Sequence, residues 1–250
     1  MSRDLYTLVG HKSLSFMNPM STRAFTQVID LLELSPGSTI ADFGCGFAEC
    51  ALRIIERYRA HADCVELSPL IAGVARERAA KRVPPELIRI HEGDAGTFKA
   101  TIPPATFDLT ICTGSSHALG GYQQMLQTLT RLTKPGGKIL VGEGYWKKEP
   151  SKDYLHEFGL ARDEMPFYHE LFEPAIGLNL LCDFSTTASE QDFDDYEWSH
   201  SRAIESYAQS HPSEPTSAQF LARSRSWRRG YVHWGRDTLG FALVLFRKQS

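Results

Sequence analysis

The feature that most constrains this chain is a short apolar run that ends in a turn with two alternating glycines. The run covers residues 40–43, and Gly44 and Gly46 follow it directly, with a helix expected over residues 49–58. Glycine has no Cβ, so the backbone can turn tightly and approach a ligand. The helix N-terminus adds free N–H groups and a positive dipole end. Together they predict a nucleotide-type cradle at the carboxyl end of a first strand. An ordinary strand-to-helix turn is the alternative.

The cradle departs from the dinucleotide-binding pattern G-x-G-x-x-G, because Glu49 stands where the third glycine belongs. Glu49 and Asp42 would both repel a pyrophosphate, so an acid here suits a positively charged ligand. Residues 42–48 resemble the first motif of class I S-adenosylmethionine-dependent methyltransferases, D/E-x-G-x-G-x-G, with Ala48 at the last glycine position. The resemblance implies S-adenosyl-L-methionine as the cofactor, bound by Asp42, Cys45 and the two glycines.

Two further acids lie at the carboxyl ends of the next two expected strands, 62–66 and 87–91. Glu66 is the last residue of the first strand, and Asp94 lies shortly after the second. Glu66 lies 24 residues after Asp42, at the distance where an acid accepts hydrogen bonds from two ribose hydroxyls. A surface Glu at a strand end is the alternative. The resemblance implies that Asp94 holds the adenine amino group and that a neighbouring backbone N–H meets the ring. A turn-forming Asp is the other interpretation. The cofactor-binding residues assigned with these two acids are Leu67 and Ala95.

The fourth expected strand, 107–112, is followed by small residues that include Gly114. These leave room for the methyl-bearing sulfonium and the acceptor. Residues 134–137 resemble the L-K-P-G-G turn that precedes the fifth strand, 139–143, in the same family. After the fourth strand there is no N/D-P-P-Y/F/W motif, which disfavours amino methylation of nucleic-acid bases and of protein glutamine.

Alternating strands and helices over 39–143 predict a doubly wound, Rossmann-like α/β sheet with helices on both faces. Two closing strands, 178–185 and 239–246, would complete the seven-stranded sheet of class I methyltransferases, with the last strand antiparallel. We expect one domain, 1–250, with helical cap insertions. Its core is assigned to 21–145 and the two closing strands, and its cap and lid segments to 1–20, 146–177 and 190–236. Residues 1–20 are expected to be irregular.

Composition places the chain among soluble globular proteins, with 42% hydrophobic and 23% charged residues. The formal net charge of −3 provides no global field for nucleic acid or an acidic membrane. No apolar run is long enough to span a bilayer, and the N-terminus lacks an apolar signal core. The five cysteines form no C-x-x-C pair, which favours reduced thiols in a cytoplasmic protein and no metal site. Oligomeric state is not predicted.

The predicted reaction is methyl transfer to an O, N or S atom of a small-molecule acceptor. One alternative is an RNA or protein methyltransferase that uses the basic stretch 223–236, and another is a non-catalytic cofactor-binding subunit. That stretch follows an acidic segment, 192–197. Mutual neutralisation of two solvated faces is the other interpretation of its charge.

The catalytic candidates are chosen by their positions relative to the carboxyl ends of the expected strands. His117 lies five residues past the fourth strand, where it could act as the general base, or else pack at a helix start. Glu143, at the end of the fifth strand, could orient the acceptor, and His169 and His233 are rival bases. Aromatic bodies with polar tips suit small-molecule pockets, although packing explains aromatic residues equally well. The substrate-pocket candidates are Tyr145, Trp146, His169 and Trp198.

Overall fold

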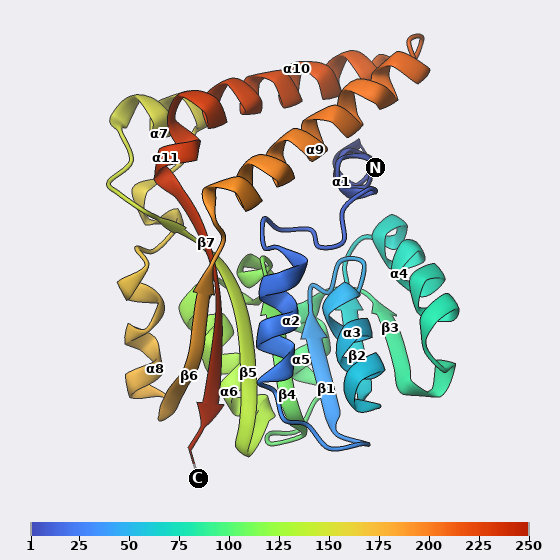
Figure 1. Ribbon diagram of the computed structural model, residues 1–250, viewed down its shortest axis with the longest axis vertical. Coiled ribbons are helices and arrows are strands. Elements are labelled where there is room, and N and C mark those ends of the chain that lie inside the picture. Colours follow the sequence, from blue (N-terminus) through green and yellow to red (C-terminus); the bar gives the residue numbers. More distant parts are fainter. Residues whose placement is uncertain (1, 250) are drawn as a thin grey trace.

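A seven-stranded sheet forms the centre of the computed structural model, which describes residues 2–249 (Figure 1). The strand order is β3-β2-β1-β4-β5-β7-β6. The first five strands pair in parallel, and β7 runs antiparallel to both β5 and β6. This confirms the predicted class I methyltransferase sheet with its antiparallel last strand. The strands are β1 (Thr39–Phe43), β2 (His61–Glu66), β3 (Ile88–Glu92), β4 (Phe107–Thr113), β5 (Thr133–Trp146), β6 (Leu180–Thr187) and β7 (Leu239–Lys248).

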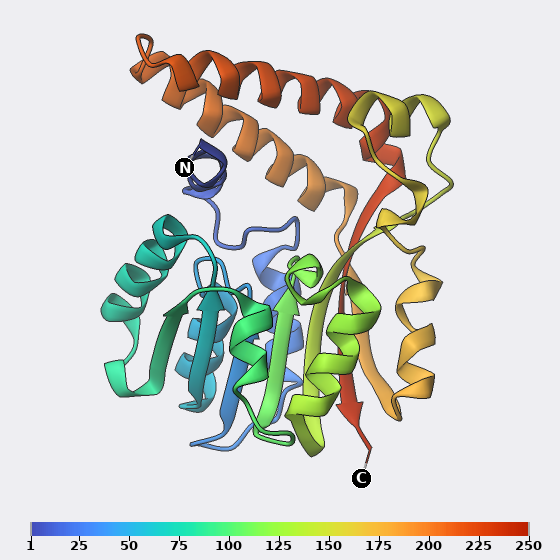
Figure 2. The same ribbon diagram turned by 180° about the vertical axis from the view of Figure 1, so that it is seen from behind.

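Helices cover both faces of the sheet, with α2 and α3 on one face and α5 and α6 on the other (Figures 1 and 2). The α-helices are α1 (Ser2–His11), α2 (Thr22–Asp30), α3 (Glu49–Tyr58), α4 (Pro69–Arg82), α5 (Ala95–Ala100), α6 (Tyr122–Leu132), α7 (Lys152–Phe158), α8 (Glu173–Gly177), α9 (Glu190–Ser210), α10 (Pro215–Gly230) and α11 (Arg236–Thr238). Short 3₁₀ turns are η1 (Pro85–Leu87), η2 (Ser116–Leu119), η3 (Arg162–Glu164) and η4 (His169–Leu171), and η5 (Tyr231–Gly235) is a π-turn.

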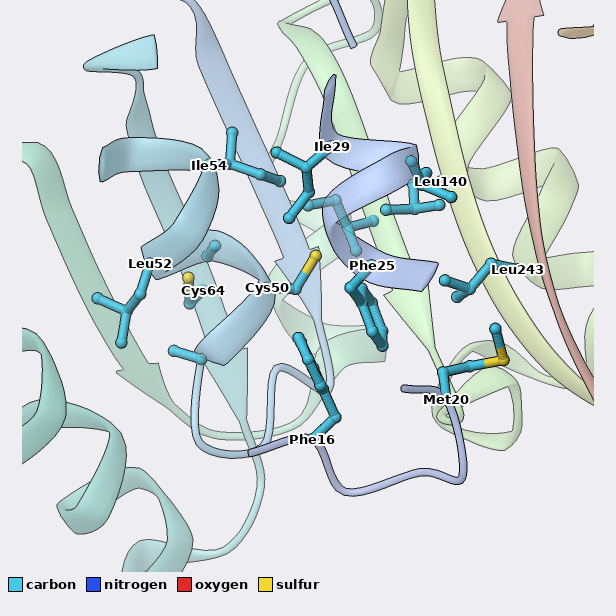
Figure 3. Packing of buried hydrophobic residues seen from close by; sticks show 14 of the residues in the cluster. Phe16, Met20, Phe25, Ile29, Cys50, Leu52, Ile54, Cys64, Leu140 and Leu243 are labelled. Carbon is cyan, nitrogen blue, oxygen red and sulfur yellow. The ribbon is translucent and has the colours of Figure 1, made fainter. Parts of the chain in front are cut away.

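Apolar packing under α2 and α3 anchors the segment that leads into the sheet (Figure 3). Phe16 stacks on Phe25 with ring centroids 3.7 Å apart, and both side chains are buried with Leu140 and Leu243 of the sheet. Each such buried side chain contributes about 1.5–3 kcal/mol. Phe16 therefore packs in the core. This packing fixes the path of residues 12–20 across the carboxyl edge of the sheet.

The N-terminal segment is helical, which corrects the expectation of an irregular stretch; Met1 lies outside the described residues. Helix α1 covers Ser2–His11 and packs Tyr6 against Ile204 of α9 and Phe220 of α10. Gly10 permits the close approach of α9, because a Cβ there would lie 2.1 Å from His200 Nε2. The partners of α1 are nearly 200 residues away in sequence, so its local pattern alone does not reveal them.

Helices α9 and α10 form an antiparallel pair above the carboxyl edge of the sheet, and α1 lies beneath α9 (Figures 1 and 2). Residues 211–214 form the turn between the two helices. Ser189 caps α9 by accepting from the Asp192 amide, while the Asp192 carboxylate accepts from the Ser189 amide. We refer to α1, α7, α9 and α10 together as the cap.

Candidate active site

A cavity of about 580 Å³ lies at the carboxyl ends of β1, β2 and β4, beneath α1 and α9. We call it the cofactor cavity. Of the residues predicted from sequence, those that line it are Gly44, Cys45, Gly46, Glu66, Leu67, Gly114 and His117. Residues that sequence reasoning had not assigned to the site close it from above, among them Arg3, Asp4, Thr7, Asn18 and Tyr196.

The glycine turn forms the floor of this cavity and requires glycine on two grounds. Gly44 and Gly46 have φ of +70° and +55°, in the left-handed region that other residues rarely adopt. A Cβ on Gly44 would lie 2.4 Å from Ser115 Cβ, and one on Gly46 would lie 2.7 Å from Met17 Sδ. The floor is therefore bare backbone, which a ligand can approach closely.

Replacing Gly44 with alanine should lower the free energy of unfolding by about 1–3 kcal/mol, because it combines a left-handed backbone with a clash against Ser115. Urea unfolding measures this. Gly73→Ala is the matched control, since Gly73 lies in α4 with open space around it. The control should be neutral or slightly stabilising. Equal effects at the two positions would refute the steric argument.

Glu66 places its carboxylate at the end of β2, against the same turn. Oε2 accepts from the Gly46 amide at 3.1 Å, and Oε1 accepts from the Ser68 amide at 2.9 Å. Burial raises the pKa of Glu66, and these amides partly offset the effect. An acceptor-only carboxylate facing the cavity fits a pair of ribose hydroxyls, which are donors.

Asp42 lies beneath the turn, 2% exposed, and is not among the residues that line the cavity. Its Oδ1 has no hydrogen-bond partner among the described residues. Burial and the nearby Glu66 raise the pKa of Asp42 to about 7. A positive charge above the turn would stabilise the ionised carboxylate, so the floor suits a cationic ligand group.

Asp94 is exposed at the N-terminus of α5, where its Oδ1 accepts from the Thr97 amide at 2.7 Å and from Thr97 Oγ1 at 3.0 Å. These hydrogen bonds lower the pKa of Asp94. Ala95 is buried against the sheet. Neither residue lines the cofactor cavity. Contact with adenine stays a prediction for both.

The Glu143 side chain lies on the same face of the sheet as Val141 and Tyr145. This face is opposite the one that α2 and α3 cover (Figures 1 and 2). Burial raises the pKa of Glu143 to about 7, partly offset by Ser116, and its Oε2 has no partner among the described residues. It does not line the cofactor cavity. The contact with Ser116 thus places Glu143 beside η2, the turn that holds His117, although Glu143 itself does not line the cavity.

The four substrate-pocket candidates lie outside the cofactor cavity. Tyr145, Trp146 and His169 share a separate hollow near β5. Trp146 is fully buried and donates through Nε1 to the Arg162 carbonyl at 2.9 Å, so it packs in the core. Trp198 is 48% exposed on α9, beneath the Arg228 guanidinium. The structure does not bring these four residues together.

His11 of α1 and Tyr196 of α9 form a contact within the cap that sequence reasoning missed. The Tyr196 hydroxyl and His11 Nε2 lie 2.8 Å apart, and His11 Nδ1 lies 2.7 Å from the Thr7 carbonyl. Because the carbonyl can only accept, Nδ1 carries the proton and Nε2 accepts from Tyr196. Burial lowers the pKa of His11, so its imidazole is neutral at pH 7. The sequence signal available for this contact was that His11 lies within residues 1–20, which were assigned to the cap and lid segments.

A second cavity, of about 590 Å³, lies inside the cap between α1, α7, α9 and α10. We call it the cap cavity. Thr7, His11 and Tyr196 line both cavities and form the wall between them. The cap cavity also contains Glu197 and His200 of α9. The two cavities are therefore adjacent, with a hydrogen-bonded pair at their boundary.

Comparison with known proteins agrees with this geometry. Residues 40–137, from β1 to the turn within β5, match the family described as "Methyltransferase domain". The fold is that of the class I S-adenosylmethionine-dependent methyltransferases. The matched segment holds the glycine turn, Glu66, Asp94 and His117.

Three similar proteins span nearly the whole chain. A methyltransferase from Geobacter sulfurreducens, solved with S-adenosyl-L-homocysteine, has a TM-score of 0.88 at 20% identity and covers 98% of each chain. A methyltransferase from Thiobacillus denitrificans, also solved with S-adenosyl-L-homocysteine, has a TM-score of 0.86 at 20% identity over 97% of each chain. The uncharacterised protein YjhP of Escherichia coli (strain K12) is 23% identical over 91% of this chain and 92% of its own.

Residues 2–249 lack two features, a metal-binding cluster and a membrane-spanning helix. No group of three or more His, Cys, Asp or Glu residues there could hold a metal ion. No helix in the same range is long and apolar enough to cross a membrane.

Proposed function

We propose that the chain transfers a methyl group from S-adenosylmethionine to an O, N or S atom of a small-molecule acceptor. The observation that carries the proposal is the pair of adjacent cavities with a shared wall of Thr7, His11 and Tyr196. Each has the volume of a small-molecule site. The cofactor cavity would hold the cofactor, and the cap cavity would hold the acceptor.

The residues of the cofactor cavity fit the proposed cofactor. The bare backbone at Gly44 and Gly46 allows close approach, and Glu66 supplies acceptors for the ribose. Asp42 beneath the turn favours positive charge. The bound cofactor would supply an electrophilic methyl group on its sulfonium. The protein holds the two reactants in line and excludes water, which prepays the entropy of their encounter.

His117 is the residue to which we assign the base. It lies in η2 at the carboxyl end of β4, and it lines the cofactor cavity near Gly114. Of the three histidines named as possible bases, it is the one that lines this cavity. His169 lies in the separate hollow near β5, and His233 is exposed in η5. An imidazole at this position could accept a proton from an acceptor that binds through the cap.

Charge pairing in the cap supports a small molecule over RNA. Arg225 pairs with Glu205 at 2.8 Å, Arg229 with Glu157 at 2.8 Å, and Arg236 with Asp194 at 2.9 Å. Most of the positive charge of 223–236 is thus neutralised within the protein. Strong RNA binding requires unpaired cations that release counterions from phosphates.

Replacing Glu66 with alanine should weaken S-adenosylmethionine binding by about 1–3 kcal/mol, because the ribose donors lose their acceptor. Calorimetric titration with S-adenosylmethionine measures the affinity, and circular dichroism checks the fold. Glu77→Ala is the control, since Glu77 is exposed on α4 outside the cavity. Wild-type affinity in a folded Glu66→Ala protein would remove Glu66 from the site. Absence of binding in the wild type would overturn the proposed function.

A further inference from the structure

Glu197 of α9 is a buried carboxyl group in the wall of the cap cavity. The residue is 9% exposed, and its Oε2 accepts from Trp227 Nε1 at 2.8 Å. No basic side chain among residues 2–249 forms an ion pair with it. Burial raises the pKa of Glu197 to about 7. A buried acid without a cationic partner is unfavourable in its ionised form, and a cation in the cavity would stabilise that form.

Apart from Arg223, the rest of the wall also favours a cation. Tyr6, Phe158 and Trp227 contribute aromatic rings, and Phe158 and Trp227 meet edge to face at 5.6 Å. Burial lowers the pKa of His200 to about 4, so at neutral pH this imidazole adds no positive charge. Arg223 is exposed, with its guanidinium over the Tyr6 ring at 4.4 Å. Aromatic faces beside a carboxylate attract ammonium groups.

We infer that the cap cavity recognises an acceptor that carries a basic amine, with its ammonium group beside Glu197 and the aromatic ring of Trp227. This inference rests on the proposed function and adds to it the chemical class of the acceptor. An ammonium held there has no free electron pair, so it anchors the acceptor and is not the methylated atom. A second atom of the acceptor would reach the cofactor cavity past the wall of His11 and Tyr196.

The test uses two probes that differ in one charge. Choline carries a trimethylammonium group, and 3,3-dimethylbutan-1-ol has carbon in place of the nitrogen with nearly the same shape. Each is titrated into the full chain saturated with S-adenosylhomocysteine, with binding followed by ligand-observed NMR. Wild type should bind choline about tenfold or more tightly than the alcohol, because only choline gains from the carboxylate and the ring faces.

Glu197→Gln removes the charge and retains an oxygen that can accept from Trp227. It should reduce the preference for choline several-fold and leave only the part that the ring faces contribute. Glu205→Gln is the matched control, because Glu205 lies on the same helix, pairs with Arg225 and does not line the cap cavity. It should leave the preference unchanged. Ser226→Lys provides a second variant, since Ser226 lines the cavity from α10 and a lysine there would repel choline.

Each outcome decides the inference. Equal affinity of the two probes for wild type overturns it without any variant. A preference that is undiminished in Glu197→Gln places the cation elsewhere and also overturns it. If Glu197→Gln does not fold, unchanged choline affinity in Ser226→Lys has the same meaning. Failure of the proposed function can be told apart in the same titration, because it would appear as absent binding of S-adenosylhomocysteine itself.

Discussion

Replacing His117 with alanine is expected to lower kcat by about 10²–10⁴-fold, the usual contribution of a positioned general base. The expectation rests on the place of His117 in the wall of the cofactor cavity, beside the small residues that follow β4. A general base must be deprotonated in order to accept a proton, so the dependence of wild-type kcat on pH should differ from that of His117→Ala. Steady-state kinetics between pH 5 and 9 with an accepted small molecule would measure both effects.

His233→Ala is the control for this prediction, because His233 is exposed in η5 and does not line the cavity. It should retain the wild-type rate and pH profile. A His117→Ala protein with unchanged kcat and an unchanged profile would exclude His117 as the base. The rate would then depend on the alignment of the reactants alone, or on the buried pair of His11 and Tyr196.

The stability difference between Asp42→Asn and wild type is expected to grow by about 4 kcal/mol from pH 4 to pH 8. Burial and Glu66 raise the pKa of Asp42 from 3.8 to about 7. Between these values the folded protein keeps a proton that the unfolded chain has released, so wild type loses about 1.4 kcal/mol per pH unit from this group. The loss is complete above pH 7. Asparagine does not titrate, so the variant escapes it.

Urea unfolding of both proteins at several pH values would measure this difference. Taking the difference between the two proteins cancels the titration of all other groups that keep their surroundings. Asp153→Asn, at an exposed position on α7, should show little pH dependence in the same comparison. A difference between Asp42→Asn and wild type that stays constant from pH 4 to pH 8 would show that Asp42 titrates normally in the folded protein.

The strands and helices up to β5 and the glycine cradle could be predicted from sequence because their signals are local. The glycine turn needs particular residues at particular backbone angles, and Glu66 is the last residue of its strand. The strand-helix alternation up to β5 likewise follows from short-range pattern. Comparison with the methyltransferase sheet then placed β7 antiparallel, as the structure confirms.

The cap could not be derived in the same way, because its contacts join distant parts of the chain. Nothing near His11 in sequence indicates that its ring meets Tyr196 of α9. An aromatic residue such as Trp198 can face solvent or a cavity, and a shift of one residue along the helix decides between them. The acidic residue that does line the cap cavity, Glu197, is the next residue toward the N-terminus.

The position of β7 has a consequence for synthesis of the chain. This strand is the last in sequence, yet it lies between β5 and β6. A growing chain can therefore assemble β1 to β5 and the glycine turn early, while β6 has no described neighbour until residues 239–248 emerge. Until then the β5 edge is open, with unpaired backbone groups that another chain could join. Completion of the sheet and protection of its open edge from aggregation thus wait for residues 239–248.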